Sequence, residues 1–223
     1  MVTATEAMAR VAQLAAWQWG LVTTAQAAGE GVGRMQLVRL EAAGVIERVD
    51  QGVYAMVAAP EQHRRFQAAW LAIDPVRTAE DRLADRPPSA AVSHTSAASL
   101  HGLGDLLDDV PEVTVPGRKQ TRRSIRIHRA PLADDDVTLV DGLPTTTVER
   151  TVVDLLRDGH SPDHVAQIVD QATRRGVVDL DDLARRLEPL ARAHRQRSGR
   201  AFVDHLLDIA GLPTPAASGR EVR

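Results

Sequence analysis

Serine and histidine lie next to each other in the stretch SHTSAASLHGL, which holds Ser93, His94, Ser96 and His101. A histidine beside a serine is the pair that hydrolases use as base and nucleophile. However, no Gly-x-Ser-x-Gly turn surrounds either serine, and a helix-capping serine followed by a half-buried histidine accounts for the same residues. We therefore predict that this stretch is structural and that the chain is not an enzyme.

Two other patterns could bind a metal ion. His160 and His164 are four residues apart, a spacing that can place two ligands on one helix face. Because His160 precedes Ser161, the expected helix cap, we expect this pair to lie off the helix and in solvent. The carboxylate runs LLDDV and ADDDV are typical of solvated loops, and the absence of cysteine excludes disulfides and thiolate zinc sites. The sequence predicts no metal and no cofactor.

Basic residues are concentrated between residues 117 and 129, in GRKQTRRSIRIHR. Two interpretations stay open. The segment is either a phosphate-binding patch, with Arg118, Lys119, Arg122 and Arg123 as DNA contacts, or a β-hairpin whose outer face is solvated.

The composition limits the class of protein. The chain has 223 residues and a formal net charge of −3, which suits two domains and does not by itself indicate nucleic-acid binding. No apolar run approaches the roughly 20 residues that span a bilayer, and the N-terminus lacks the regions of a signal peptide. We expect a cytoplasmic protein without a membrane partner.

The N-terminal 59 residues show the order helix, helix, helix, strand, strand. A first helix runs from residue 4 to a terminating glycine, Thr23 or Thr24 is suited to cap a short second one, and a third runs from near Gly33 to Gly44. The period then changes to two in VIERV and VYAM, which flank a DQG turn. This order predicts a winged helix-turn-helix domain over residues 1–59.

The third helix is the expected recognition helix, with Leu37 and Leu40 on its core face. Polar side chains on the other face and on the wing suit phosphates or guanine edges, and apolar ones suit thymine methyls. The predicted DNA contacts are Arg34, Met35, Gln36, Val38, Arg39, Arg48 and Gln51. Because residues 1–59 contain four arginines against five carboxylates, the alternative is that this unit packs on the rest of the protein or on a partner.

The rest of the chain divides into three segments. Residues 60–88 carry apolar residues at helical spacing before a Pro-Pro stop, and predict a helical linker. Residues 89–158 predict a small mixed α/β domain, with a strand AAV, a helix after Ser93, strands in EVTVP, SIRIHRA and DVTLVDGLPTTT, and a helix capped by Thr146 or Thr147.

Residues 159–223 predict a helical C-terminal region with a tail. Its first helix is opened by Ser161 and Pro162, and its second by Asp179. The expected fold class of the whole chain is α+β.

Several motifs, taken in order, resemble the AbiEi-type antitoxins of type IV toxin–antitoxin systems. They are RVDQGVYAM, AVSHTSAASLHGL, VTVPGR, RIHRAPL and GLPTTTVERTVVDLL, and the resemblance covers residues of about 15 to 180. It implies a repressor whose N-terminal domain binds double-stranded operator repeats upstream of its own operon. It also implies a C-terminal domain that counters a nucleotidyltransferase-like toxin.

The motif positions that carry over are Ser93, Ser96, Leu100, His101 and Gly102 in one motif, and Arg150, Thr151 and Asp154 in another. Arg150 and Asp154, four residues apart, most simply form an ion pair on their helix. Similar recognition helices are usually more basic where this one has Met35, Val38 and Glu41, which shifts the expected readout towards thymine methyl groups.

A second interpretation concerns the end of the chain. In many similar proteins, such a helical region leads into a fused endonuclease domain of the very-short-patch-repair type, whose entry resembles AASGREVR. The alternative is therefore a truncated member of that branch, acting as a targeting or interaction module.

Overall fold

The computed structural model describes residues 3–119 and 124–211. They form helices and two sheets, which confirms the predicted α+β class. The chain divides into two compact units, one of residues 1–96 and 108–146 and the other of residues 97–107 and 147–223. None of the helices formed by the described residues is long and apolar enough to cross a membrane.

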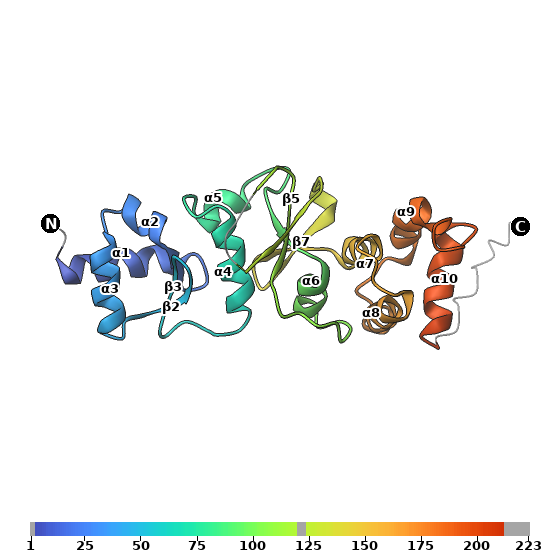
Figure 1. Ribbon diagram of the computed structural model, residues 1–223, viewed down its shortest axis with the longest axis horizontal. Coiled ribbons are helices and arrows are strands. Elements are labelled where there is room, and N and C mark those ends of the chain that lie inside the picture. Colours follow the sequence, from blue (N-terminus) through green and yellow to red (C-terminus); the bar gives the residue numbers. More distant parts are fainter. Residues whose placement is uncertain (1–2, 120–123, 212–223) are drawn as a thin grey trace, which may run out of the picture. The chain divides into compact units, whose positions relative to one another are not determined.

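The first unit begins with three helices and a three-stranded sheet (Figure 1, blue). These elements are α1 Ala4–Ala16, β1 Leu21–Thr23, α2 Thr24–Gly29, α3 Arg34–Ala42, β2 Ile46–Asp50 and β3 Val53–Met56. β3 lies between β1 and β2 and pairs antiparallel with both. The order is that of the predicted winged helix-turn-helix. β1 was not predicted, because a strand of three residues is too short to show an alternating pattern.

Side-chain caps fix where the first two helices begin. The Thr3 hydroxyl accepts the Glu6 N–H at the start of α1, and the Thr23 hydroxyl accepts the Gln26 N–H at the start of α2. In both cases the side chain at the third helical position accepts the N–H of the capping residue, which completes a capping box. Gly20, at φ +79°, makes the left-handed turn between α1 and β1, a conformation that glycine adopts without strain.

These helices and strands enclose one apolar core, to which every element contributes. Its buried members are Ala7, Val11, Val22, Ala27, Val32, Leu37, Leu40, Ile46 and Tyr54. Removing each larger side chain from water contributes roughly 1.5–3 kcal/mol. The core therefore holds α3 in a fixed rotation against the sheet.

Residues 60–88 form helices α4 Arg64–Ile73 and α5 Ala79–Leu83. α4 is buried on most sides, including Trp70 and Leu71, and it contacts strands of both sheets. Seven of its ten residues are buried, which makes α4 an interior element. The segment predicted as a linker therefore packs within the first unit.

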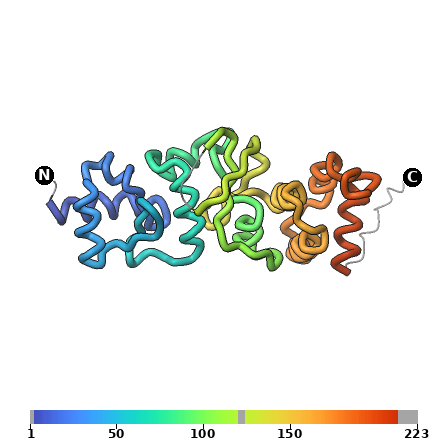
Figure 2. Tube along the Cα trace, in the orientation of Figure 1, coloured from blue at the N-terminus to red at the C-terminus, as the bar shows by residue number. Residues whose placement is uncertain are grey.

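A five-stranded sheet follows, which Figure 2 traces in green to yellow. Its strands are β4 Ala91–Val92, β5 Glu112–Val115, β6 Arg126–Arg129, β7 Val137–Val140 and β8 Leu143–Thr146, in the order β6-β5-β4-β8-β7. A single 3-10 turn, Asp134–Asp136, precedes β7. β7 and β8 form a hairpin whose turn residues, Asp141 and Gly142, both have positive φ, as the DG signal predicts.

β5 and β6 pair in parallel, with Glu112 opposite Arg126 and Thr114 opposite His128. The predicted β-hairpin at this place is therefore wrong. A parallel pair needs a connection that can span the length of a strand, roughly 13 Å for four residues at 3.3 Å per residue, and ten residues separate β5 from β6 in the sequence. β6 consequently forms one edge of the sheet.

The second unit is helical (Figure 1, orange to red). It contains the end of α6 His94–Leu100, together with α7 Val148–Arg157, α8 Pro162–Arg175, α9 Leu180–Ala191 and α10 Gly199–Ile209. Thr147, Ser161 and Asp179 cap α7, α8 and α9, as the sequence predicts, and Ser198 caps α10. Apolar side chains from all four C-terminal helices meet in one core.

Gly199 brings the backbones of α9 and α10 into contact. A Cβ atom at this position would lie 2.0 Å from the Ala184 carbonyl oxygen and 2.7 Å from the Glu188 nitrogen. The Gly199 N–H donates to the Glu188 carboxylate at 2.6 Å. Position 199 therefore has no room for a side chain.

Candidate nucleic-acid interface

Helix α3 has one buried face and one exposed face. Leu37 is fully buried and Leu40 nearly so, whereas Met35 is 66% and Val38 43% exposed. Since residues three or four apart share a face of a helix, the leucine pair sets the rotation of α3. The face predicted to read DNA is thereby turned to solvent.

The turn between α2 and α3 fixes where α3 begins. Gly31 has φ +73°, Val32 is fully buried in the core, and Gly33 is the extended N-cap residue. The Gln36 side-chain oxygen accepts the Gly33 N–H at 2.7 Å. Of the predicted DNA contacts, Gln36 is therefore engaged in capping the helix that carries it.

Arg34 and Arg39 lie on the exposed side of α3. Among the described residues, no carboxylate forms an ion pair with either guanidinium. A guanidinium offers five donors in a planar fork, which matches phosphate oxygens or the edge of guanine. These two side chains are available for an external anion or base.

The wing is the ribbon of β2 and β3. Arg48 and Gln51 are both exposed on it, as predicted for backbone contacts. Arg48 Nε donates to the Asp50 carbonyl at 3.4 Å, and the Gln51 N–H donates to the Asp50 carboxylate at 2.7 Å. A register shift between Arg48 and Asp50 twists the ribbon just before Gly52, whose φ is +71°. The tip of the wing therefore has a defined shape.

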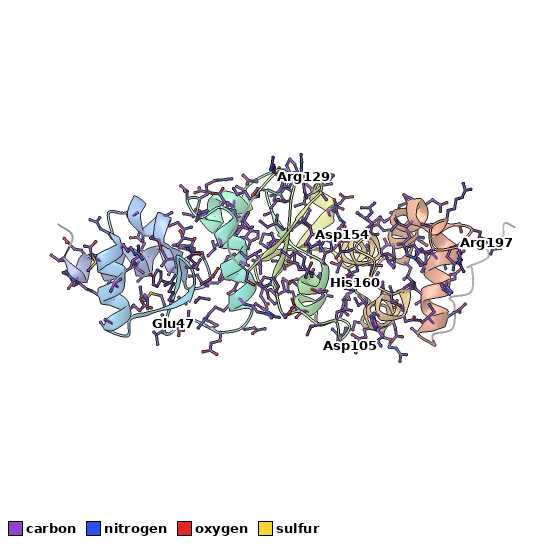
Figure 3. All side chains as sticks on the ribbon, in the orientation of Figure 1. Glu47, Asp105, Arg129, Asp154, His160 and Arg197 are labelled. Atoms are coloured by element: carbon purple, nitrogen blue, oxygen red, sulfur yellow. The ribbon has the colours of Figure 1, made fainter. Side chains whose placement is uncertain are left out.

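Glu47 places a carboxylate on the wing, where Figure 3 labels it. Arg64 of α4 donates its Nη1 to Glu47 Oε1 at 2.5 Å. This pairing reduces the repulsion that a lone carboxylate would exert on DNA phosphates, within the limits that salt screening sets for surface charges. The excess of carboxylates in residues 1–59 is thus offset by an arginine from outside that segment.

The basic segment belongs to the second sheet, not to the winged helix. Arg118 and Lys119 are exposed after β5, while Arg122 and Arg123 lie outside the described residues. Arg129, labelled in Figure 3, is exposed on the edge strand β6. The structure thus gathers the α3 and wing residues on neighbouring elements and keeps the basic segment as a separate surface, whose DNA contacts stay a prediction.

The serine and histidine stretch is buried, with Ser93 and Ser96 fully inaccessible. Ser96 Oγ accepts the Glu112 N–H at 2.9 Å and donates to the Asp108 carboxylate at 2.8 Å. Ser93 Oγ accepts the Thr114 hydroxyl at 2.8 Å. Hydroxyls in such fixed bonds hold β5 to the start of α6, which supports the structural interpretation.

Three other histidines, His101, His160 and His164, belong to no metal-binding group among the described residues. His101 is half-buried. His160, labelled in Figure 3, lies between α7 and α8, as predicted, whereas His164 is an exposed residue of α8 itself. The prediction that both lie off the helix is therefore wrong for His164, because the Ser161 cap starts α8 early enough to include it.

Glu112, which no motif of the sequence singles out, lies at the centre of this buried network. Its carboxylate accepts the Thr95 hydroxyl, lies 2.6 Å from His128 Nε2, and is 3.5 Å from Arg126 Nη1. Burial raises the pKa of Glu112, but the bonds to His128 and Thr95 and the charge of His94 outweigh it and lower the pKa to about 2. Glu112 is thus a buried anion in the second sheet.

Arg150 and Asp154 form the expected ion pair, and the structure shows it buried. Arg150 Nε lies 2.9 Å from both carboxylate oxygens of Asp154, one turn along α7. Both residues are at most 6% exposed. Each charge therefore depends on the other, because a buried charge without its partner is strongly destabilising.

Two family models match the chain. Residues 9–57, which include α3 and the wing, match the model described as "Transcriptional regulator, AbiEi antitoxin". Residues 89–209 match the model described as "AbiEi antitoxin C-terminal domain". No curated protein matches the chain significantly.

A solved structure shares the fold. One match is the crystal structure of RV2827C protein from Mycobacterium tuberculosis, with a TM-score of 0.53, 20% sequence identity, and coverage of 93% of this chain and 78% of that chain. At this identity the likeness shows the fold alone. The second family model, by contrast, covers more than half of the 223 residues, and both models name the same kind of protein. The chain belongs to the AbiEi antitoxin family of DNA-binding transcriptional regulators.

Proposed function

We propose that this chain represses transcription of its own operon by placing α3 in the major groove of operator repeats, with the wing on the DNA backbone. The observation that carries this proposal is the exposed face of α3, where Arg34 and Arg39 have no carboxylate partner among the described residues. Membership of a transcriptional regulator family supports it.

The side chains of α3 suit a mixed readout. Arg34 and Arg39 can bind phosphates or guanine edges, and the exposed Met35 and Val38 can contact thymine methyl groups. Binding free energy and specificity would then come from different residues, since phosphate contacts position a protein and base contacts select the sequence.

Loss of the α3 arginines tests this function. Arg34→Ala and Arg39→Ala should each weaken binding to duplex DNA from upstream of the gene by roughly 1–3 kcal/mol if each makes a bidentate base contact. Arg157→Ala removes the same charge from an exposed position of α7 and serves as the matched control. Fluorescence anisotropy at fixed salt measures the affinities, and wild-type binding by both α3 variants would refute the role of α3.

We further infer that the chain acts as an antitoxin against a nucleotidyltransferase-like toxin, directly or through its function in the cell. The match of residues 89–209 to an antitoxin C-terminal domain supports this inference. Co-expression with the toxin gene of the same operon should restore growth. The Arg34→Ala/Arg39→Ala double variant should still restore growth while losing repression, and a failure to restore growth by the wild-type chain would reject the inference.

A further inference from the structure

Three side chains from separate elements meet in the second sheet: His94 at the start of α6, Glu112 in β5 and His128 in β6. Within residues 3–119 and 124–211, this is the one group of histidine and carboxylate side chains that could hold a metal ion, with ligand atoms all within 4.8 Å of one another. We propose that these three residues bind one divalent transition-metal ion of the zinc class.

The donor set fits such an ion. Two imidazoles and one carboxylate, with a fourth position left for water, form a ligand set that Zn²⁺ accepts. Metal–ligand bonds of about 2.0–2.2 Å place tetrahedral donors roughly 3.4 Å apart. Donor atoms that lie within 4.8 Å of one another can reach this spacing by side-chain rotation.

One ring must turn for both histidines to bind the same ion. The imidazoles of His94 and His128 are stacked, with centroids 3.5 Å apart and planes inclined by 15°. Because an imidazole nitrogen coordinates in the plane of its ring, near-parallel rings cannot both point at one ion. His128 lies on the edge strand β6 with 17% of its side chain exposed, so it has room to turn. Binding then replaces its bond to Glu112 with a shared ion.

Ser93 is placed to orient His94. His94 Nδ1 lies 2.9 Å from Ser93 Oγ, which also accepts the Thr114 hydroxyl. When Nδ1 carries the proton and donates it to Ser93, Nε2 presents its lone pair to the ion, as in most histidine–metal sites. The backbone of His94 is left-handed, at φ +53°, a conformation that non-glycine residues adopt mainly where surrounding structure imposes it.

The charges around the site make Arg126 a competitor of the ion. Glu112 is 1% exposed, and Arg126 Nη1 lies 3.5 Å from its carboxylate, with 55% of the Arg126 side chain in solvent. Arg126 offsets the charge of Glu112 when no ion is bound. An ion at the same carboxylate would repel Arg126, so removing this arginine should strengthen metal binding.

The consequence of binding is a link between β6 and the start of α6. β6 is held along one side only, by its parallel pairing with β5. An ion that binds the folded protein and not the unfolded chain raises stability by mass action. Bound metal would therefore fix the edge strand that follows the basic segment.

The test uses the full-length protein, stripped with a chelator. Titration with Zn²⁺ against a chromophoric chelator should give one equivalent bound, Co²⁺ should produce the visible absorption of a tetrahedral site, and Zn²⁺ should raise Tm. Glu112→Gln and His128→Asn should weaken Zn²⁺ binding at least tenfold. Ser93→Ala should weaken Zn²⁺ binding roughly 10- to 100-fold, because losing the group that hydrogen-bonds a ligating histidine usually has an effect of that size. Arg126→Gln should strengthen it.

His164→Asn, on the exposed surface of α8, is the matched control and should bind as the wild type does. Circular dichroism checks that each variant is folded. If Glu112→Gln fails to fold, His128→Asn, at a half-buried edge position, decides the outcome. Absence of a bound equivalent in the wild type overturns the proposal, as does unchanged binding in His128→Asn.

Discussion

Arginine occurs in opposite settings in α3 and in α7. Arg34 and Arg39 are exposed, and no carboxylate among the described residues pairs with them, while Arg150 is buried and bonded to both oxygens of Asp154. A buried, paired guanidinium supports the fold and cannot reach another molecule. An exposed, unpaired one contributes little to the fold and can bind an anion. Burial and pairing therefore separate arginines that hold the structure from those that act outside it.

The strongest test of this comparison is Asp154→Ala. Removing the carboxylate takes both Asp154 bonds from a buried guanidinium, and the free energy of unfolding should fall by about 3–5 kcal/mol. Urea denaturation measures the change. Replacing both residues, as Arg150→Met/Asp154→Leu, should destabilise far less, because no buried charge remains. A loss below about 1 kcal/mol in Asp154→Ala would mean that Arg150 is not a structural charge.

Leu37→Ala tests the buried face of α3. Leu37 is fully buried in the N-terminal core, so its truncation should lower the free energy of unfolding by roughly 2–5 kcal/mol, through lost burial and the cavity left behind. Operator binding should weaken only in proportion to the unfolded fraction. Denaturation and DNA titration on the same preparation separate the two effects, and a fully stable variant would show that the core does not set the position of α3.

The basic segment tests whether exposed charge alone predicts DNA contact. Replacing Arg118, Lys119, Arg122 and Arg123 with glutamine should reduce the slope of log K against log[salt] by about 0.9 per lost phosphate contact, with little change in sequence preference. If the segment faces the toxin instead, the slope stays as in the wild type and growth rescue is lost. Binding at several salt concentrations, beside a growth-rescue assay, decides between the two.

Val38→Ala should have the smallest effect on the fold. Val38 is 43% exposed on the face of α3 that is predicted to read DNA, and surface substitutions usually change stability by less than about 0.5 kcal/mol. The affinity of the variant for operators rich in thymine should nevertheless fall, because the expected contact between Val38 and a thymine methyl group is lost. A thermal melt and a DNA titration check both statements, and a marked drop in Tm would place Val38 in the core.

The winged helix could be predicted from sequence because its signals are local. Thr23 and Gly33 start helices within a few residues of the bonds they make, and the spacing of Leu37 and Leu40 encodes the rotation of α3. The helix caps at Ser161 and Asp179 were predictable for the same reason.

The parallel pairing of β5 with β6 and the buried cluster around Glu112 could not be predicted in this way. Both depend on residues far apart in the chain, such as His94 and His128, and no local pattern states which strands become neighbours. A glutamate at the head of the buried strand EVTV is the one signal that could have drawn notice, since a carboxylate in a buried strand needs a partner.

The contact between α9 and α10 limits how this family can vary. The first position of a helix ordinarily accepts many residues, yet at position 199 even a methyl group would overlap the Ala184 carbonyl oxygen. A larger residue at this position would force the start of α10 away from α9, and the space opened between them would need other side chains to fill it. The residue at position 199 thus sets how closely the backbones of α9 and α10 can approach.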